Sequence, residues 1–234
     1  MHDHDHSHPE LHLKSSALLT DIVIGISDGL TVPFALAAGL SGAVHNTQVI
    51  VIAGIAEIAA GSIAMGLGGY LAGKTEIDHY HSELRREYEE VERLPEKERE
   101  EVREIFEGIG LSADLQQRAT EEIARDKDKW VDFMMKFELG LERPDPRRAS
   151  KSALNIGLSY VAGGIIPLSP YFFTEEPFVG LRWSAVLTLI CLFIFGYFKS
   201  RITGVNAWSG AAKVMLIGTL AAGAAYAVAR LFSA

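Results

Sequence analysis

Long apolar stretches and one long charged stretch divide this chain of 234 residues. A helix needs about 20 apolar residues to cross a bilayer, and five stretches reach that length. Glycine and other small residues are frequent in them, as in membrane helices that pack backbone to backbone. The pattern predicts five transmembrane helices, over residues 17–40, 47–73, 150–170, 178–198 and 207–231.

The charged stretch lies between the second and third apolar stretches. Residues 74–151 hold 22 of the 30 acidic and 16 of the 22 basic residues. Such segregation indicates a membrane part and a separate charged part instead of one globular core. We predict an all-α polytopic membrane protein with five transmembrane helices and a three-helix cytoplasmic insert between the second and third. Its parts are a His-rich tail (1–16), transmembrane helices 1 and 2 (17–73), an acidic helical domain (74–148) and transmembrane helices 3–5 (149–234).

The helices of the charged part can be placed from their start and stop signals. No Gly or Pro interrupts residues 74–93, so the second transmembrane helix should continue into the insert as one long helix. Pro95 suits the first turn of the next helix, which ends near Gly108 and Gly110. Ser112 is a typical N-cap for a third helix that reaches about Leu139.

Basic residues set the predicted orientation, because Lys and Arg near helix ends mark the cytoplasmic side. They precede the first and third predicted helices and end the fourth: Lys14, Arg147, Arg148, Lys151, Lys199 and Arg201. The N-terminus and the charged domain are therefore expected in the cytoplasm. The membrane that holds the protein is expected to be the inner (plasma) membrane of a prokaryote or the vacuolar membrane of a eukaryote. No cleavable signal peptide is expected, and the lone Cys191 excludes an internal disulfide.

Two carboxylates lie inside predicted transmembrane helices, Asp28 in the first and Glu57 in the second. A charge at bilayer depth costs about 2.5–3.5 kcal/mol on insertion scales, so both should face protein or water. Met65 follows Glu57 on nearly the same helix face, about two turns further along. One acid could serve only to join helices by hydrogen bonds. Two acids and a thioether on successive helices favour a polar pathway through the membrane.

Glutamates and methionines recur at helical spacing in the charged domain. They are Glu87, Glu90, Glu98, Glu101, Met134, Met135 and Glu138. Carboxylate and thioether ligands together suit Fe2+ or Mn2+ and disfavour Mg2+ and Ca2+. Spacing alone is nonetheless more typical of an exposed, salt-bridged helical hairpin. Because Lys and Arg are interleaved with Glu in an acidic domain, no nucleic-acid partner is expected.

A different metal chemistry is suggested by Glu76-Ile77-Asp78-His79. This is the Glu-x-x-His motif of di-iron helical bundles, which use two such motifs and two further glutamates. The sequence contains one, so a membrane-bound, ferritin-like di-iron oxidase is the weaker alternative. A metal-binding membrane protein without transport activity is a further one.

Two long motifs resemble a known family. DIVIGISDGLTVPFAL (residues 21–36) and AEIAAGSIAMGLGGYLAGKTEIDHY (residues 56–80) are similar to the first two membrane helices of the vacuolar iron transporters. The resemblance extends over the chain beyond the His-rich tail. It implies a homodimer in the lipid bilayer with an ion path between the subunits. It also implies export of Fe2+, and of Mn2+ or Zn2+, from the cytosol in exchange for protons. No enzymatic activity and no prosthetic group are expected.

The resemblance also implies roles for particular residues. Asp28, Glu57 and Met65 match the family's positions along the ion path. The seven glutamates and methionines of the charged domain match its metal-binding positions: Glu87, Glu90, Glu98, Glu101, Met134, Met135 and Glu138. With the resemblance, a metal site in this domain becomes the favoured interpretation.

Overall fold

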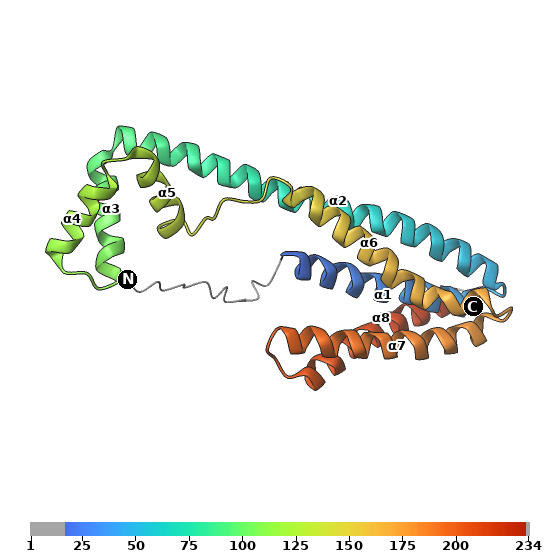
Figure 1. The fold of residues 1–234 in the computed structure, drawn as a ribbon. Coiled ribbons are helices and arrows are strands. Elements are labelled where there is room, and N and C mark those ends of the chain that lie inside the picture. The colour runs from blue at the N-terminus through green and yellow to red at the C-terminus, as the bar shows by residue number, and fades with distance from the viewer. Residues whose placement is uncertain (1–16, 233–234) are drawn as a thin grey trace, which may run out of the picture. The chain divides into compact units, whose positions relative to one another are not determined.

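The computed structural model describes residues 17–232, and the predicted His-rich tail lies outside them. All regular elements in this range are helical (Figure 1). They are α1 (Ala17–Ala43), α2 (Thr47–Arg93), α3 (Pro95–Gly108), α4 (Ala113–Ile123), α5 (Lys127–Phe137), α6 (Arg148–Leu168), the 3-10 turn η1 (Ser169–Phe172), α7 (Pro177–Ile202) and α8 (Ala207–Phe232). The all-α prediction is therefore confirmed.

Five of these helices are long and apolar enough to cross a membrane, as predicted. They are α1, α2, α6 with η1, α7 and α8. The second continues without interruption from Thr47 to Arg93, so the long helix expected from the sequence is present. α1 likewise continues through Pro33.

The prediction of a single third helix in the charged part was wrong, because the structure has two helices there, α4 and α5. The chain leaves α4 at Ala124, and Asp126 begins the next helix in an extended conformation. The Asp126 carboxylate accepts hydrogen bonds from the backbone N–H groups of Asp128 and Lys129. These bonds satisfy donors that would otherwise lack a partner at the start of α5, so Asp126 stabilises the break.

The described residues form two compact units, which we call the apolar unit (residues 17–70 and 150–232) and the charged unit (residues 71–149). In the apolar unit α1 packs against α7 and α8. α6 approaches α1 closely at two glycines: a Cβ on Gly25 would lie 2.6 Å from the Cβ of Ser159, and one on Gly29 would lie 2.9 Å from the Cα of Tyr160. Only glycine permits such backbone contact, as expected for membrane helices.

The charged unit has an apolar core despite its composition. α2, α3 and α5 contribute side chains to it, with Val102, Val131 and Met134 fully buried. Two glycines with positive φ follow helix ends, Gly110 (φ 88°) after α3 and Gly140 (φ 64°) after α5. Because L-residues rarely adopt this conformation, glycine lets the chain reverse at both points.

Candidate ion-binding sites

Three glutamates from three helices meet in the charged unit. Glu87 lies on α2, Glu98 on α3, and Glu138 is the C-cap residue of α5. One carboxylate oxygen from each lies within 4.8 Å of the others. The turn at Leu94 and Pro95 brings α3 back towards α2, and the shared apolar core holds α5 against both. We call Glu87, Glu98 and Glu138 the glutamate triad.

Two members of the triad are buried, and their carboxylates have oxygens without hydrogen-bond partners. Glu87 is 2% exposed and Glu98 1% exposed, whereas Glu138 is exposed to solvent. Within the described part of the chain, neither oxygen of Glu98 has a hydrogen-bond partner, and Oε2 of Glu87 also has none. Unpartnered carboxylates in a desolvated position are costly unless a cation or a proton neutralises them. The site is therefore suited to bind a cation.

The electrostatics of the triad agree with this geometry. Burial, followed by the neighbouring Glu138 charge, raises the pKa of Glu87 to about 7. Burial, followed by the Glu101 charge, raises the pKa of Glu98 to about 7. The pKa of Glu138 is also raised, first by burial and then by Glu101. Near pH 7 Glu87 and Glu98 are thus partly protonated, and a metal ion would displace those protons.

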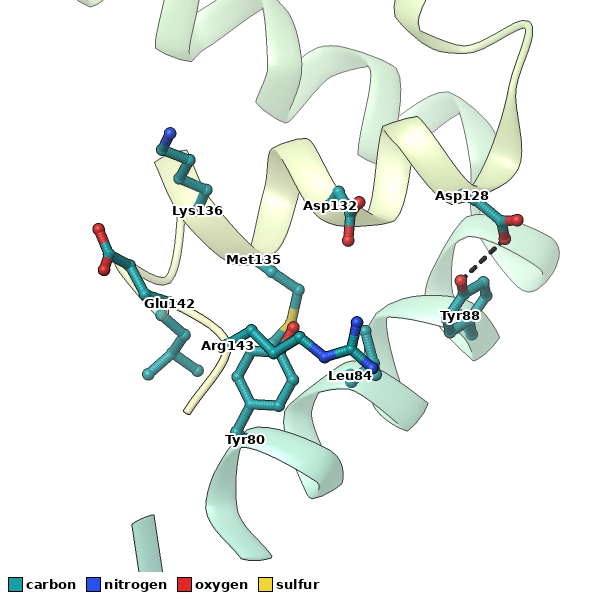
Figure 2. Close-up of a pocket in the computed structure, with 10 residues that line it drawn as sticks. Tyr80, Leu84, Tyr88, Asp128, Asp132, Met135, Lys136, Glu142 and Arg143 are labelled. Atoms are coloured by element: carbon teal, nitrogen blue, oxygen red, sulfur yellow. Dashed lines mark hydrogen bonds between the residues drawn. The ribbon is translucent and has the colours of Figure 1, made fainter. Parts of the chain in front are cut away.

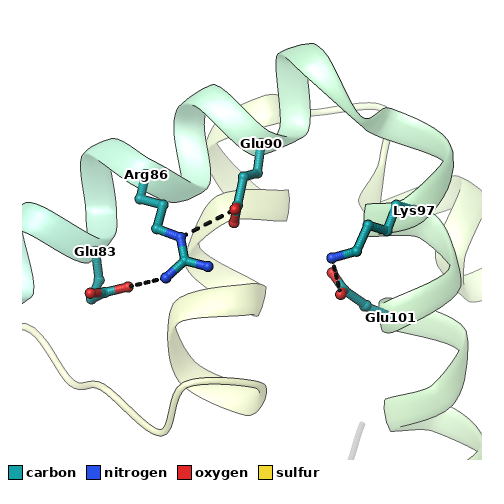
Figure 3. Close-up of polar contacts among 5 residues, drawn as sticks. All are labelled: Glu83, Arg86, Glu90, Lys97 and Glu101. Carbon is teal, nitrogen blue, oxygen red and sulfur yellow. Dashed lines mark hydrogen bonds and ion pairs between the residues drawn. The ribbon is translucent and has the colours of Figure 1, made fainter.

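Three further glutamates of α2 and α3 are paired with cations (Figure 3). The Arg86 guanidinium contacts Glu90 at 3.1 Å and Glu83 at 3.6 Å. Lys97 Nζ lies 2.7 Å from Oε1 of Glu101. Both cations are exposed and follow the helical i,i+4 spacing. They offset part of the repulsion within the acidic cluster.

The two predicted methionine ligands lie in the apolar core of this unit. Met134 is fully buried and Met135 is 2% exposed. Met135 lines a cavity of about 540 Å³ together with Tyr80 and Leu84. Figure 2 shows its side chain directed at Tyr80, while Tyr88 donates a 2.8 Å hydrogen bond to Asp128 at the same cavity. The triad residues are not among those that line this cavity, so the thioether ligation of Met135 stays a prediction.

The Glu-x-x-His motif does not join the triad. Within residues 17–232, the triad is the one cluster of three or more acidic, His or Cys side chains with metal-ligand spacing. Nδ1 of His79 lies 3.8 Å from Glu83, and Glu76 lies 4.0 Å from Nε of Arg148. The described residues thus do not assemble a di-iron centre around this motif.

The acids of the apolar unit are separated and each has a different environment. Asp21 is 2% exposed, and α6 supplies its partners: Ser152 Oγ donates at 3.0 Å and Asn155 Nδ2 at 3.4 Å. Glu57 is half-buried and accepts a hydrogen bond from the Tyr160 hydroxyl, again from α6. Helix α6 therefore supports one carboxylate of α1 and one of α2.

Asp28 differs from both. It is half-buried, and within the described residues its carboxylate makes no hydrogen bond or ion pair. It lies close enough to interact electrostatically with the Tyr160 hydroxyl. Met65 is also half-buried. Both oxygens of Asp28 are thus free to bind a ligand.

Sequence reasoning did not identify the residues that support these acids. Tyr160, Ser152 and Asn155 lie more than 100 residues from the carboxylates they contact. The available signal was the glycines of the first two helices, because a glycine on a packed helix face leaves room for a large side chain or another backbone. Gly61 does this for the Tyr160 ring.

Five candidate membrane-spanning helices define a polytopic membrane protein, and its acidic helical insert brings two buried glutamates and an exposed one together. Residues 19–230 match the model of the VIT family, and the chain belongs to this family. The resemblance seen in the two sequence motifs is thereby confirmed.

Curated relatives match over nearly the whole chain. Vacuolar iron transporter 1 of Oryza sativa subsp. japonica is 49% identical over 98% of this chain and 90% of its own length. Vacuolar iron transporter 1 of Tulipa gesneriana is 50% identical over 95% of this chain and 90% of its own length. Protein CCC1 of Saccharomyces cerevisiae is 36% identical over 92% of this chain and 69% of its own length. The first two are named as transporters, which agrees with the prediction that this chain is not an enzyme.

Proposed function

We propose that this chain is an iron transporter that moves Fe2+, and also Mn2+ or Zn2+, out of the cytosol in exchange for protons. The observation that carries the proposal is the convergence of Glu87, Glu98 and Glu138 in a member of the VIT family, with unpartnered buried oxygens on the first two. The vacuolar iron transporters among its relatives support a multi-pass location in a vacuolar membrane or its prokaryotic counterpart.

The charged unit acts as the collecting site in this mechanism. Glu87, Glu98 and Glu138 supply oxygen ligands, with Glu90 and Glu101 nearby as further acceptors. Fe2+ and Mn2+ accept carboxylate oxygens readily. Ligation by Met134 and Met135 would add discrimination against Mg2+, which prefers oxygen and retains its water.

The apolar unit supplies the transport site. Asp28 has free carboxylate oxygens within a membrane-spanning helix, while Glu57 and Met65 lie about two turns apart on α2. Each carboxylate is either protonated or bound to metal, because both states neutralise the same charge. Metal entering from the cytosol releases protons, and protons from the far side release the metal. A single site thereby couples the two flows.

A homodimer suits the exposed face of α2. Ala56, Ala60, Ala64 and Gly68 repeat at four-residue intervals and are all exposed in the single chain. A stripe of small residues allows a second helix to approach closely. Since Glu57 and Met65 are next to this stripe in the helix, dimerisation along it would enclose an ion path between two copies.

Transport by the purified chain in liposomes tests the proposal. With an acidic interior and a trapped pH dye, added Mn2+ or anaerobic Fe2+ should enter while the interior pH rises. A protonophore that collapses the gradient should slow metal uptake. Protein-free liposomes are the control.

Each rival function gives a different result in the same assay. A channel would conduct metal without opposite proton movement. A di-iron oxidase would consume oxygen with Fe2+ and move no metal. Metal binding without uptake would reduce the protein to a metal-binding membrane protein, and any of these results would contradict proton-coupled export.

A further inference from the structure

Tyr160 connects α6 to both helices of the proposed ion path. Its backbone lies against Gly29 of α1, where a Cβ would come within 2.9 Å of the Tyr160 Cα. Its ring lies against Gly61 of α2, where a Cβ would come within 2.6 Å of the Tyr160 Cζ. The residue is 2% exposed. Close packing on two sides leaves the ring little room to turn, so the position of its hydroxyl is fixed.

The fixed hydroxyl controls one oxygen of Glu57. It donates a hydrogen bond to Oε1, while Oε2 is buried and has no hydrogen-bond partner among residues 17–232. An ionised carboxylate only accepts hydrogen bonds, and bonds to a charged acceptor are stronger than neutral ones. The carboxylate is thus held by one oxygen and free at the other.

We propose that Tyr160 is a positioning residue for Glu57 in metal transport. It holds Oε1 so that Oε2 is presented to a partly dehydrated divalent cation. Tyr160 does not contact the ion and acts through its hydrogen bond to Glu57. This inference rests on the proposed transport function, and it assigns a role to a residue of the third membrane helix, outside the matched motifs of the first two.

The first test is Tyr160→Phe, which removes the hydroxyl and keeps the ring that fills the space at Gly61. Initial rates of Mn2+ uptake into liposomes, measured over a range of Mn2+ concentrations, give KM and Vmax. KM should rise about tenfold, the size expected for losing a hydrogen bond to a charged ligand. Vmax per reconstituted protein should stay within about twofold, because the packing is retained.

Tyr171→Phe is the matched control. Tyr171 is equally buried, and its hydroxyl lies 2.8 Å from Ser41 Oγ, away from the three ion-path residues. The same loss of a buried hydroxyl should leave KM unchanged there. If Tyr160→Phe also left KM unchanged, or lowered only Vmax, Tyr160 would be a packing residue and the proposal would be overturned.

A double-mutant cycle tests whether Tyr160 acts through Glu57. In a Glu57→Gln background, Tyr160→Phe should change KM no further, and a full additional loss would overturn the proposal. Thermal unfolding of the same four proteins repeats the cycle without transport. Additive shifts in Tm would mean that the two side chains are uncoupled and would overturn it as well. Wild-type protein that moves no Mn2+ would instead contradict the proposed function, and with it any transport role for Tyr160.

Discussion

The two units place their acids in opposite ways. In the charged unit five glutamates interact electrostatically with one another, and two of them are buried without partners. In the apolar unit Asp21 and Glu57 are each held by side chains of α6, and Asp28 is unpaired. Mutual repulsion is tolerable where water, Arg86 and Lys97 are near, but carboxylates in a membrane are far more costly.

This contrast indicates two different tasks. A cluster in which Glu87 and Glu98 have pKa values of about 7 can gather an ion at cytosolic pH and release it again. Asp28 is unpaired, whereas Asp21 and Glu57 are hydrogen-bonded to side chains of α6. Asp28 can therefore bind a proton or a metal ion in turn, because no neighbouring cation within the described residues neutralises its charge. The following predictions separate these tasks, from the largest expected effect to the smallest.

Replacing Asp28 should have the largest effect. Asp28→Asn keeps the size of the side chain and removes the charge that we propose binds metal and exchanges protons. In the proposed site the bound metal ion and Asp28 form a charge pair. Removing one partner of a buried charge pair costs about 3–5 kcal/mol, so transport should fall at least about a hundredfold. Metal uptake and interior pH in liposomes measure both flows together.

Two matched variants sharpen this result. Glu175→Gln removes an exposed acid between η1 and α7 and should leave transport unchanged. Asp21→Asn should lower Tm, because Ser152 and Asn155 lose a charged acceptor, while the KM for metal is retained. Coupled transport by Asp28→Asn would rule out Asp28 as the exchanging group.

Glu98→Gln should weaken metal binding in the charged unit and stabilise the metal-free protein. Losing a charged ligand should reduce Mn2+ affinity by about tenfold or more. The variant also removes a buried charge without a hydrogen-bond partner, so the metal-free Tm at pH 8 should rise by about 2–4 °C. Calorimetric titration of the full chain carrying Asp28→Asn isolates this site, and thermal unfolding gives the Tm.

The opposite signs of these two effects make the test specific. Glu104→Gln, an exposed glutamate on the same helix, should change neither affinity nor Tm. If Glu98→Gln lowered the Tm and left affinity unchanged, Glu98 would be a structural residue and the triad would not be the collecting site.

The division into an apolar unit and a charged unit could be predicted from the sequence, because helix length and apolar composition are local properties. The five spanning helices and the start of α3 at Pro95 follow from them. The break between α4 and α5 was missed because no Gly or Pro marks it. Only the tertiary fold selects Asp126 as an N-cap from among the many acids of this stretch.

The residues that form each candidate site could be predicted only in part. Helical spacing made Glu87, Glu98 and Glu138 candidates, and the family resemblance favoured a metal site over an exposed hairpin. The convergence of three helices is nonetheless a tertiary property. The pairing of Tyr160 with Glu57 joins residues 103 positions apart, and no local pattern specifies it. The cavity beside Met135 likewise depends on how α5 and the chain after it pack against α2.

Metal binding to the charged unit should weaken as the pH falls. Glu87 and Glu98 have pKa values of about 7, so below that pH a metal ion must displace their protons. Affinity should drop about tenfold per displaced proton between pH 8 and pH 6. Stability of the metal-free protein should change in the opposite direction. A carboxyl whose pKa is raised by folding stabilises the folded state at low pH, and that contribution is lost as the pH rises through about 7.

Calorimetry in two buffers with different ionisation enthalpies measures the protons released on Mn2+ binding. Proton release should be substantial at pH 7 and small at pH 8.5. The Glu87→Gln, Glu98→Gln double variant should release fewer protons. A pH-independent affinity with no proton release would mean that these carboxylates are not the ligands.

Removing Lys97 should have the smallest effect and the opposite direction from Glu98→Gln. Lys97 pairs with Glu101 at 2.7 Å and places a positive charge beside the acidic cluster (Figure 3). Because exposed ion pairs contribute about 0–1 kcal/mol, Lys97→Gln should strengthen Mn2+ binding by up to about fivefold at pH 8, where protons compete little.

Arg118→Gln removes the same charge from an exposed pair with Asp114 on α4 and serves as the control. Added salt should shrink the difference between Lys97→Gln and wild type, because the interaction is screened. Weaker binding by Lys97→Gln would mean that Lys97 organises the ligands instead of competing with the metal, and the charged unit would then resemble the apolar unit, where each acid needs its supporting side chain.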